Sequence, residues 1–123
     1  MNVTEYNATK KELGVTASGI DSKTKKELTW KDGSVTPINT PVHIDFIETN
    51  PGFIFVTIGN TVYHTKLVTA HARFTGITKA PSLRTLERYS YDGIAKTVTG
   101  EKTEPDGYGS NGAPSWLLVV GVI

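Results

Sequence analysis

Arginine side chains gather in one short stretch of the chain. All three arginines of the 123-residue sequence lie between Arg73 and Arg88. Residues 60–100 hold six basic side chains against two acidic ones, a local charge of +4, whereas the whole chain carries only +1. Arginine presents two parallel N–H donors to phosphate or carboxylate groups. The stretch therefore favours an anionic ligand, although a solvated basic face would give the same composition.

The spacing within this stretch predicts a single binding patch. His71 and Arg73 are two residues apart and would share one face of a strand, while Arg84, Arg88 and Tyr91 recur at helical intervals. A helix packed beside that strand would bring these five side chains together, and a guanidinium can hold phosphate while an aromatic ring stacks on a base. Phe74 adjoins the patch as a second stacking surface or as a core residue. The predicted ligand-binding residues are His71, Arg73, Phe74, Arg84, Arg88 and Tyr91.

Other chemistries find weaker support in the sequence. His43, His64 and His71 could join Asp45 and Glu48 around a metal ion, but His64 and His71 are separated by an odd number of residues and would face opposite sides of one strand. The chain has no cysteine, and it shows no phosphate-binding loop, dinucleotide glycine motif or nucleophile elbow. We therefore predict a binding protein that is not an enzyme and uses neither a cofactor nor a metal.

Three β-rich segments must position the first part of this patch. Residues 41–46 alternate apolar and polar side chains, which is typical of a strand with one buried face, and residues 53–58 are apolar on both faces. The pair Gly59-Asn60 then separates residues 53–58 from residues 61–74, and such a two-residue link predicts a tight hairpin. Residues 42–74 are thus expected to form an antiparallel three-stranded meander.

A helix must position the second part. Residues 81–92 begin with Pro81-Ser82 and end before Gly93, which are start and stop signals, with Leu83 and Leu86 on the expected inward face. Residues 114–123 form a short apolar element that reads equally as strand or helix. Residues 1–40 suggest short strands between polar turns. The fold class is α+β, with an N-terminal antiparallel sheet, and residues 1–123 are expected to form a single domain.

Composition also bears on location. No apolar run approaches the about 20 residues needed to cross a bilayer, and the N-terminal residues are polar. We therefore expect a cytoplasmic protein without a membrane partner.

Three segments resemble small proteins encoded by tailed bacteriophages: HIDFIETNPGFIFVTIGNTVYHT, APSLRTLERYSYDGIAKTVTG and EPDGYGSNGAPSWLL. Among phage proteins, a sheet followed by two helical segments resembles the Thoeris anti-defence family, whose members sequester cyclic ADP-ribose signals without cleaving them. This resemblance implies a homo-oligomer in the host bacterial cytoplasm that binds an intact nucleotide-like signal. It also implies ligand contacts from Arg73, Phe74, Arg84 and Arg88, and a helical segment at residues 114–123.

The sequence is also compatible with two other functions. Residues 81–100 loosely resemble the recognition helix and wing of excisionase-type or MerR-type DNA-binding proteins, in which basic helix residues contact phosphates and base edges. The low net charge and the sheet-like sequence before the helix argue against nucleic acid as the partner. The third function is a phage structural or assembly protein whose apolar C-terminus packs into a neighbouring subunit.

Overall fold

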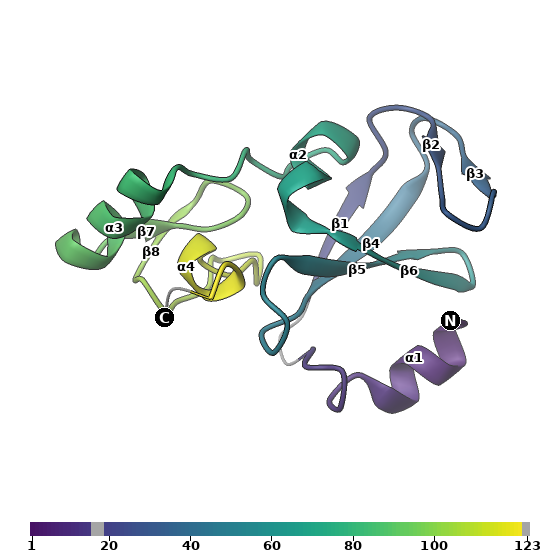
Figure 1. The fold of residues 1–123 in the computed structure, drawn as a ribbon, viewed down its shortest axis with the longest axis horizontal. Coiled ribbons are helices and arrows are strands. Elements are labelled where there is room, and N and C mark those ends of the chain that lie inside the picture. Colours follow the sequence, from purple (N-terminus) through teal and green to yellow (C-terminus); the bar gives the residue numbers. More distant parts are fainter. Residues whose placement is uncertain (16–18, 122–123) are drawn as a thin grey trace.

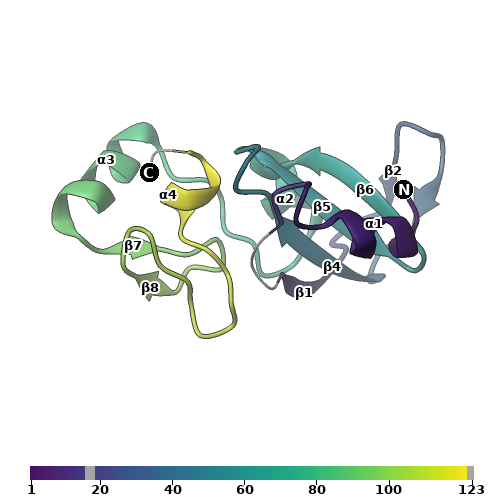
Figure 2. The same ribbon diagram turned by 90° about the horizontal axis from the view of Figure 1, so that it is seen from below.

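An antiparallel sheet forms one end of the molecule, and a smaller group of helices and hairpins forms the other (Figures 1 and 2). The computed structural model describes residues 1–15 and 19–121. It contains both helices and strands, as the predicted α+β class requires. The elements are α1 (Val3–Thr9), β1 (Ile20–Lys23), β2 (Leu28–Thr29), β3 (Val35–Thr36), β4 (Pro41–Phe46), β5 (Phe53–Ile58), β6 (Thr61–Lys66), the 3-10 turn η1 (Leu67–Thr69), α2 (Ala70–Arg73), α3 (Leu83–Asp92), β7 (Ala95–Lys96), β8 (Lys102–Thr103) and α4 (Trp116–Val119).

The predicted meander corresponds to three adjacent strands of the main sheet, β4, β5 and β6. The strands of this sheet pair antiparallel in the order β1-β4-β5-β6, so β6 lies at one edge. Gly59, with a φ of 60°, helps to form the predicted tight turn between β5 and β6. Ile44 and Val56 pair across β4 and β5 and face the larger core, whereas Phe55 faces a second cluster beneath α1. Both faces of β5 are therefore covered, as its apolar sequence predicts.

The last predicted strand is shorter than expected. The strand ends at Lys66, and residues 67–73 form η1 and α2 in place of continuing strand. Leu67, Ala70 and Phe74 are all buried, and their spacing of three and then four residues matches a helical period rather than an alternating one. His71 and Arg73 consequently lie on a helix, where a separation of two residues places them on different sides. The prediction that they share a strand face is wrong.

The C-terminal part agrees more closely with its predicted elements. Ser82 caps α3 because its hydroxyl accepts a hydrogen bond from the Thr85 N–H at 3.3 Å, and Gly93 ends the helix with a φ of 72°. Leu86 faces the core as expected, but Leu83 is 69% exposed, which corrects its predicted place on the inward stripe. The short hairpin of β7 and β8 follows, with β7 against α3.

The C-terminal segment is helical where the structure describes it. Ser115 caps α4 through a hydrogen bond from the Leu117 N–H, and Trp116 and Leu117 are buried in the larger core. Residues 122–123 of the predicted element lie outside the described residues. Ile44 and Phe74 from the first part belong to the same core as Trp116, so the two ends of the molecule pack around one continuous apolar cluster.

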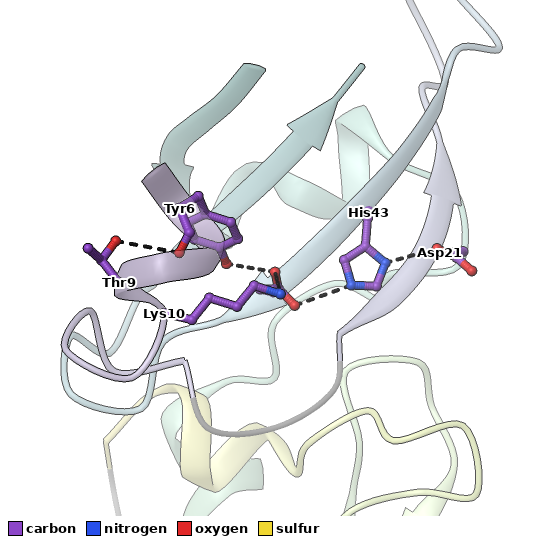
Figure 3. Close-up of polar contacts among 6 residues, drawn as sticks. Tyr6, Thr9, Lys10, Asp21 and His43 are labelled. Carbon is purple, nitrogen blue, oxygen red and sulfur yellow. Dashed lines mark hydrogen bonds and ion pairs between the residues drawn. The ribbon is translucent and has the colours of Figure 1, made fainter. Parts of the chain in front are cut away.

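A buried carboxylate ties α1 to the sheet. Asp45 on β4 is 1% exposed, and the Tyr6 hydroxyl on α1 donates to its Oδ2 at 2.6 Å (Figure 3). Lys10 Nζ lies 3.6 Å from the same oxygen, and His43 Nε2 lies 3.3 Å from Oδ1. The second His43 nitrogen lies 2.9 Å from Asp21. Burial and the bond to Asp45 raise the pKa of Tyr6, which keeps its phenol protonated and donating.

We expect the substitution Tyr6→Phe to destabilise the fold. It removes the hydroxyl donor and leaves a buried carboxylate oxygen without its hydrogen bond, which costs about 1–3 kcal/mol. Urea denaturation followed by circular dichroism measures the change in the free energy of unfolding. Tyr91→Phe is the control because Tyr91 is 90% exposed. Equal stability of the two variants would show that the bond to Asp45 does not hold α1.

Candidate functional site: a groove beside the edge strand

The six predicted ligand-binding residues do not form one patch. Arg73 lines a groove beside β6, whereas Arg84, Arg88 and Tyr91 are exposed on α3 at the other end of the molecule (Figures 1 and 2). His71 is half-buried on α2, and one of its ring nitrogens lies 3.2 Å from the Val68 carbonyl oxygen. The arginines cluster in the sequence but separate in space, because the connection between α2 and α3 carries the chain away from the sheet.

Phe74 is a core residue. Its side chain is 0% exposed and packs in the larger apolar cluster with Ala70 and Trp116. The Phe74 N–H also closes α2 by donating to the Ala70 carbonyl at 2.8 Å. Of the two roles considered for this ring, its position supports core packing, and it offers no surface to a ligand.

The groove has a volume of about 660 Å³ and runs along β6. Three cationic side chains line it, namely Lys31, Lys66 and Arg73, against the single carboxylate of Asp32. Arg73 Nη1 donates to Thr65 Oγ1 at 3.2 Å, which leaves its other N–H groups available. The groove therefore carries an excess of positive charge suited to an anion.

Asp32 is engaged within its own turn. The Ser34 N–H and the Ser34 hydroxyl donate to Asp32 Oδ1 at 2.9 and 2.6 Å, and these bonds lower the pKa of the carboxyl group. The same Ser34 hydroxyl lies 2.9 Å from the Tyr63 hydroxyl. Asp32 therefore helps to fix a groove wall through Ser34.

Aromatic rings form that wall. Trp30 and Tyr63 stack with centroids 4.1 Å apart and planes 12° from parallel. Trp30 is held further because its indole N–H donates to Thr36 Oγ1 at 2.9 Å. The rings of Phe53 and His64 also line the groove and stack at 5.0 Å, but they project from the opposite face of the sheet to Tyr63. Fixed rings beside cations are the arrangement that binds a flat base attached to phosphate.

Sequence reasoning found Arg73 but missed Trp30, Tyr63 and Lys66. Trp30 and Tyr63 are 33 positions apart, and Trp30 follows β2 in the region where only short strands between polar turns were predicted. No local spacing connects them. The available signal was the cationic character of residues 60–100, which contains Lys66 and Arg73 but also the remote arginines of α3.

The described residues contain no group of three or more His, Asp or Glu side chains placed to hold a metal ion. Within residues 1–15 and 19–121, no helix has the length and apolar character required to span a membrane. No protein-family model, curated protein or solved structure matches this chain. The groove and the surface of α3 are therefore the two features of the chain that bear on its function.

The different roles of Phe74 and Arg73 can be tested by the effect of each side chain on the free energy of unfolding. Phe74→Ala should cost about 3–5 kcal/mol of unfolding free energy because it empties a closed core position. Arg73→Ala should cost about 1 kcal/mol or less, since it removes one hydrogen bond at the surface of the groove. Thermal and urea denaturation of both variants give the comparison. A Phe74→Ala protein as stable as the wild type would contradict the core assignment.

Proposed function

We propose that the protein binds an anionic, nucleotide-like ligand in the groove beside β6 and does not cleave it. The observation that carries this proposal is the stacked pair Trp30 and Tyr63 in the same groove as Lys66 and Arg73. The cations pair with phosphate, and the indole ring offers a surface on which a base stacks. Pockets for small organic ligands generally measure about 300–1,000 Å³, and this groove falls within that range.

We propose more specifically that the ligand is an immune signal of the cyclic ADP-ribose type, and that the protein is a phage anti-defence factor that sequesters it. The phage-like sequence segments support this choice of ligand. The groove supports its chemical requirements, namely positive charge for phosphates and an aromatic surface for adenine. A homo-oligomer in the host cytoplasm completes the proposal, and subunit contacts would enclose a ligand that an open groove holds on one side.

Native mass spectrometry with ADP, cyclic ADP-ribose isomers and cyclic oligonucleotides tests the proposal. We expect a bound nucleotide of unchanged mass, and the same spectra report the oligomeric state. Arg73→Glu should weaken binding at least tenfold, because it removes a charge-assisted contact worth about 1.5–3 kcal/mol and adds repulsion.

Arg84→Glu is the matched control, with the same charge change outside the groove. Equal affinity of the Arg73→Glu and Arg84→Glu proteins would rule out the groove as the binding site. A nucleotide returned with altered mass would rule out sequestration without cleavage.

A second candidate, DNA binding, is favoured by the surface of α3. Arg84 and Arg88 are exposed on this helix and make no ion pair with the described residues. The β7–β8 hairpin follows α3 and exposes Lys96 and Lys102. This order of helix and hairpin is the one that the excisionase-type resemblance implies. Residues 75–121 nevertheless carry five basic and five acidic side chains, so we expect few phosphate contacts.

Salt-titrated binding to duplex DNA tests this second candidate. Specific contacts from α3 predict that log K falls linearly with log salt, and that the double variant Arg84→Glu, Arg88→Glu reduces the slope by about 2. Arg73→Glu should leave DNA binding unchanged, since Arg73 lies in the groove. If the protein does not bind DNA, or if the double variant binds DNA with an unchanged salt dependence, DNA binding through α3 is ruled out.

The structure gives less support to the third function, that of a phage structural or assembly protein. The described part of the C-terminal segment is buried in the core of its own chain, with Trp116 and Leu117 packed beside Ala113. It is therefore not the free apolar tail that packing into a neighbouring subunit requires.

A further inference from the structure

Main-chain groups of β6 point away from the sheet at alternate residues. The Val62 N–H donates outward to the Met1 carbonyl at 2.8 Å, whereas the Leu67 N–H donates inward to the Gly52 carbonyl, also at 2.8 Å. In an antiparallel strand, the N–H and C=O groups of successive residues point to opposite sides of the strand. The N–H and C=O groups of Val62, His64 and Lys66 therefore face away from β5.

Part of this edge is already closed by the chain itself. Residues 1–3 run beside the start of β6, where Val62 bonds to Met1 and the Val3 N–H donates to the Asn60 carbonyl at 3.2 Å. Beyond Val62 the edge is open: within the described residues, the N–H and C=O of His64 and the N–H of Lys66 make no hydrogen bond. The Lys66 carbonyl accepts from the Thr69 hydroxyl at 3.3 Å.

The two residues that carry these open groups, His64 and Lys66, both line the groove. The His64 carbonyl is an acceptor, and the Lys66 N–H is the next outward-facing donor along the strand. A nucleobase edge carries the complementary pair, an N–H donor beside a ring nitrogen or carbonyl acceptor. Trp30 lines the same groove and supplies a ring for stacking.

We propose that the open edge of β6 recognises the base of the bound nucleotide through its main chain, with the His64 carbonyl accepting from the base and the Lys66 N–H donating to it. This inference rests on the proposed function of the groove. It narrows the ligand to nucleotides whose base keeps a free donor and acceptor side by side, and it makes base recognition independent of the side chains at these two positions.

The length of the open edge favours a base over an extended peptide. Residues 1–3 close one end, and the strand stops at Lys66, where η1 begins. Only residues 64–66 remain, whereas a strand in a sheet usually runs for about five or six residues. An added peptide strand would gain few main-chain bonds in this space, while a single base needs only two.

Substitution with proline removes the proposed donor without disturbing the sheet. Lys66 has a φ of −79°, within the range that proline adopts, and its N–H faces away from β5. Lys66→Pro and Lys66→Ala both remove the ammonium group, but only Lys66→Pro removes the N–H. The two variants therefore differ in the one group under test, and equal melting temperatures confirm that both fold.

Isothermal titration with ADP and with inorganic pyrophosphate measures the effect. We expect Lys66→Pro to bind ADP about fivefold or more weakly than Lys66→Ala, because the base loses a hydrogen bond. Pyrophosphate, which has no base, should bind both variants equally. In the wild-type protein, ADP should protect the Lys66 amide from hydrogen exchange.

Three other results would refute either base recognition by the main chain or the proposed function. Equal ADP affinity of the two variants would show that the main chain does not recognise the base, while the proposed function would stand. Failure of the wild-type protein to bind any nucleotide would refute the proposed function and this inference together. An acidic extended peptide that protects the His64 and Lys66 amides, where ADP protects neither, would replace base recognition with strand addition.

Discussion

The buried carboxylate of Asp45 is the constraint on which the arrangement of the sheet depends. A carboxylate removed from water is stable only when donors and cations replace its hydration. Tyr6 and Lys10 supply these groups to Oδ2 from α1 and the residue that follows it, whereas Oδ1 lies 3.3 Å from His43 Nε2 and has no hydrogen-bond partner among the described residues. The side chain of Asp45 therefore requires the N-terminal segment to lie across the sheet (Figure 3).

The position of the N-terminal segment decides how much of the sheet edge is open. Once Tyr6 reaches Asp45 and packs against Phe55, residues 1–3 lie beside the start of β6, and the Met1 carbonyl accepts from its outward-facing Val62 N–H. The edge that remains is short and lies beside the Trp30 and Tyr63 rings. The contact between Tyr6 and Asp45 therefore affects the shape of the groove, although neither residue lines it.

The sequence predicts those parts of the fold whose signals are local. Apolar alternation in residues 41–46, the turn at Gly59 and the cap signals around α3 all correspond to observed elements. The break at Lys66 was missed because valine and alanine residues after it continue to alternate with polar ones. The helical spacing of the buried side chains is recognisable only once it is known which of these residues enter the core.

The candidate site, like the fold, could be predicted only where its signals are local in the sequence. Arg73 was predicted from its type, but Trp30 comes from a segment more than 30 positions earlier, and only the folded chain brings it beside Tyr63 in the groove that Arg73 lines. The cationic stretch that drew attention to Arg73 is itself divided between two surfaces. In the groove three cations face one carboxylate, whereas the charges of residues 75–121 balance. Because an anion responds to the local field and not to charge counted along the chain, the excess of cations lining the groove is what supports our choice of it as the proposed anion site.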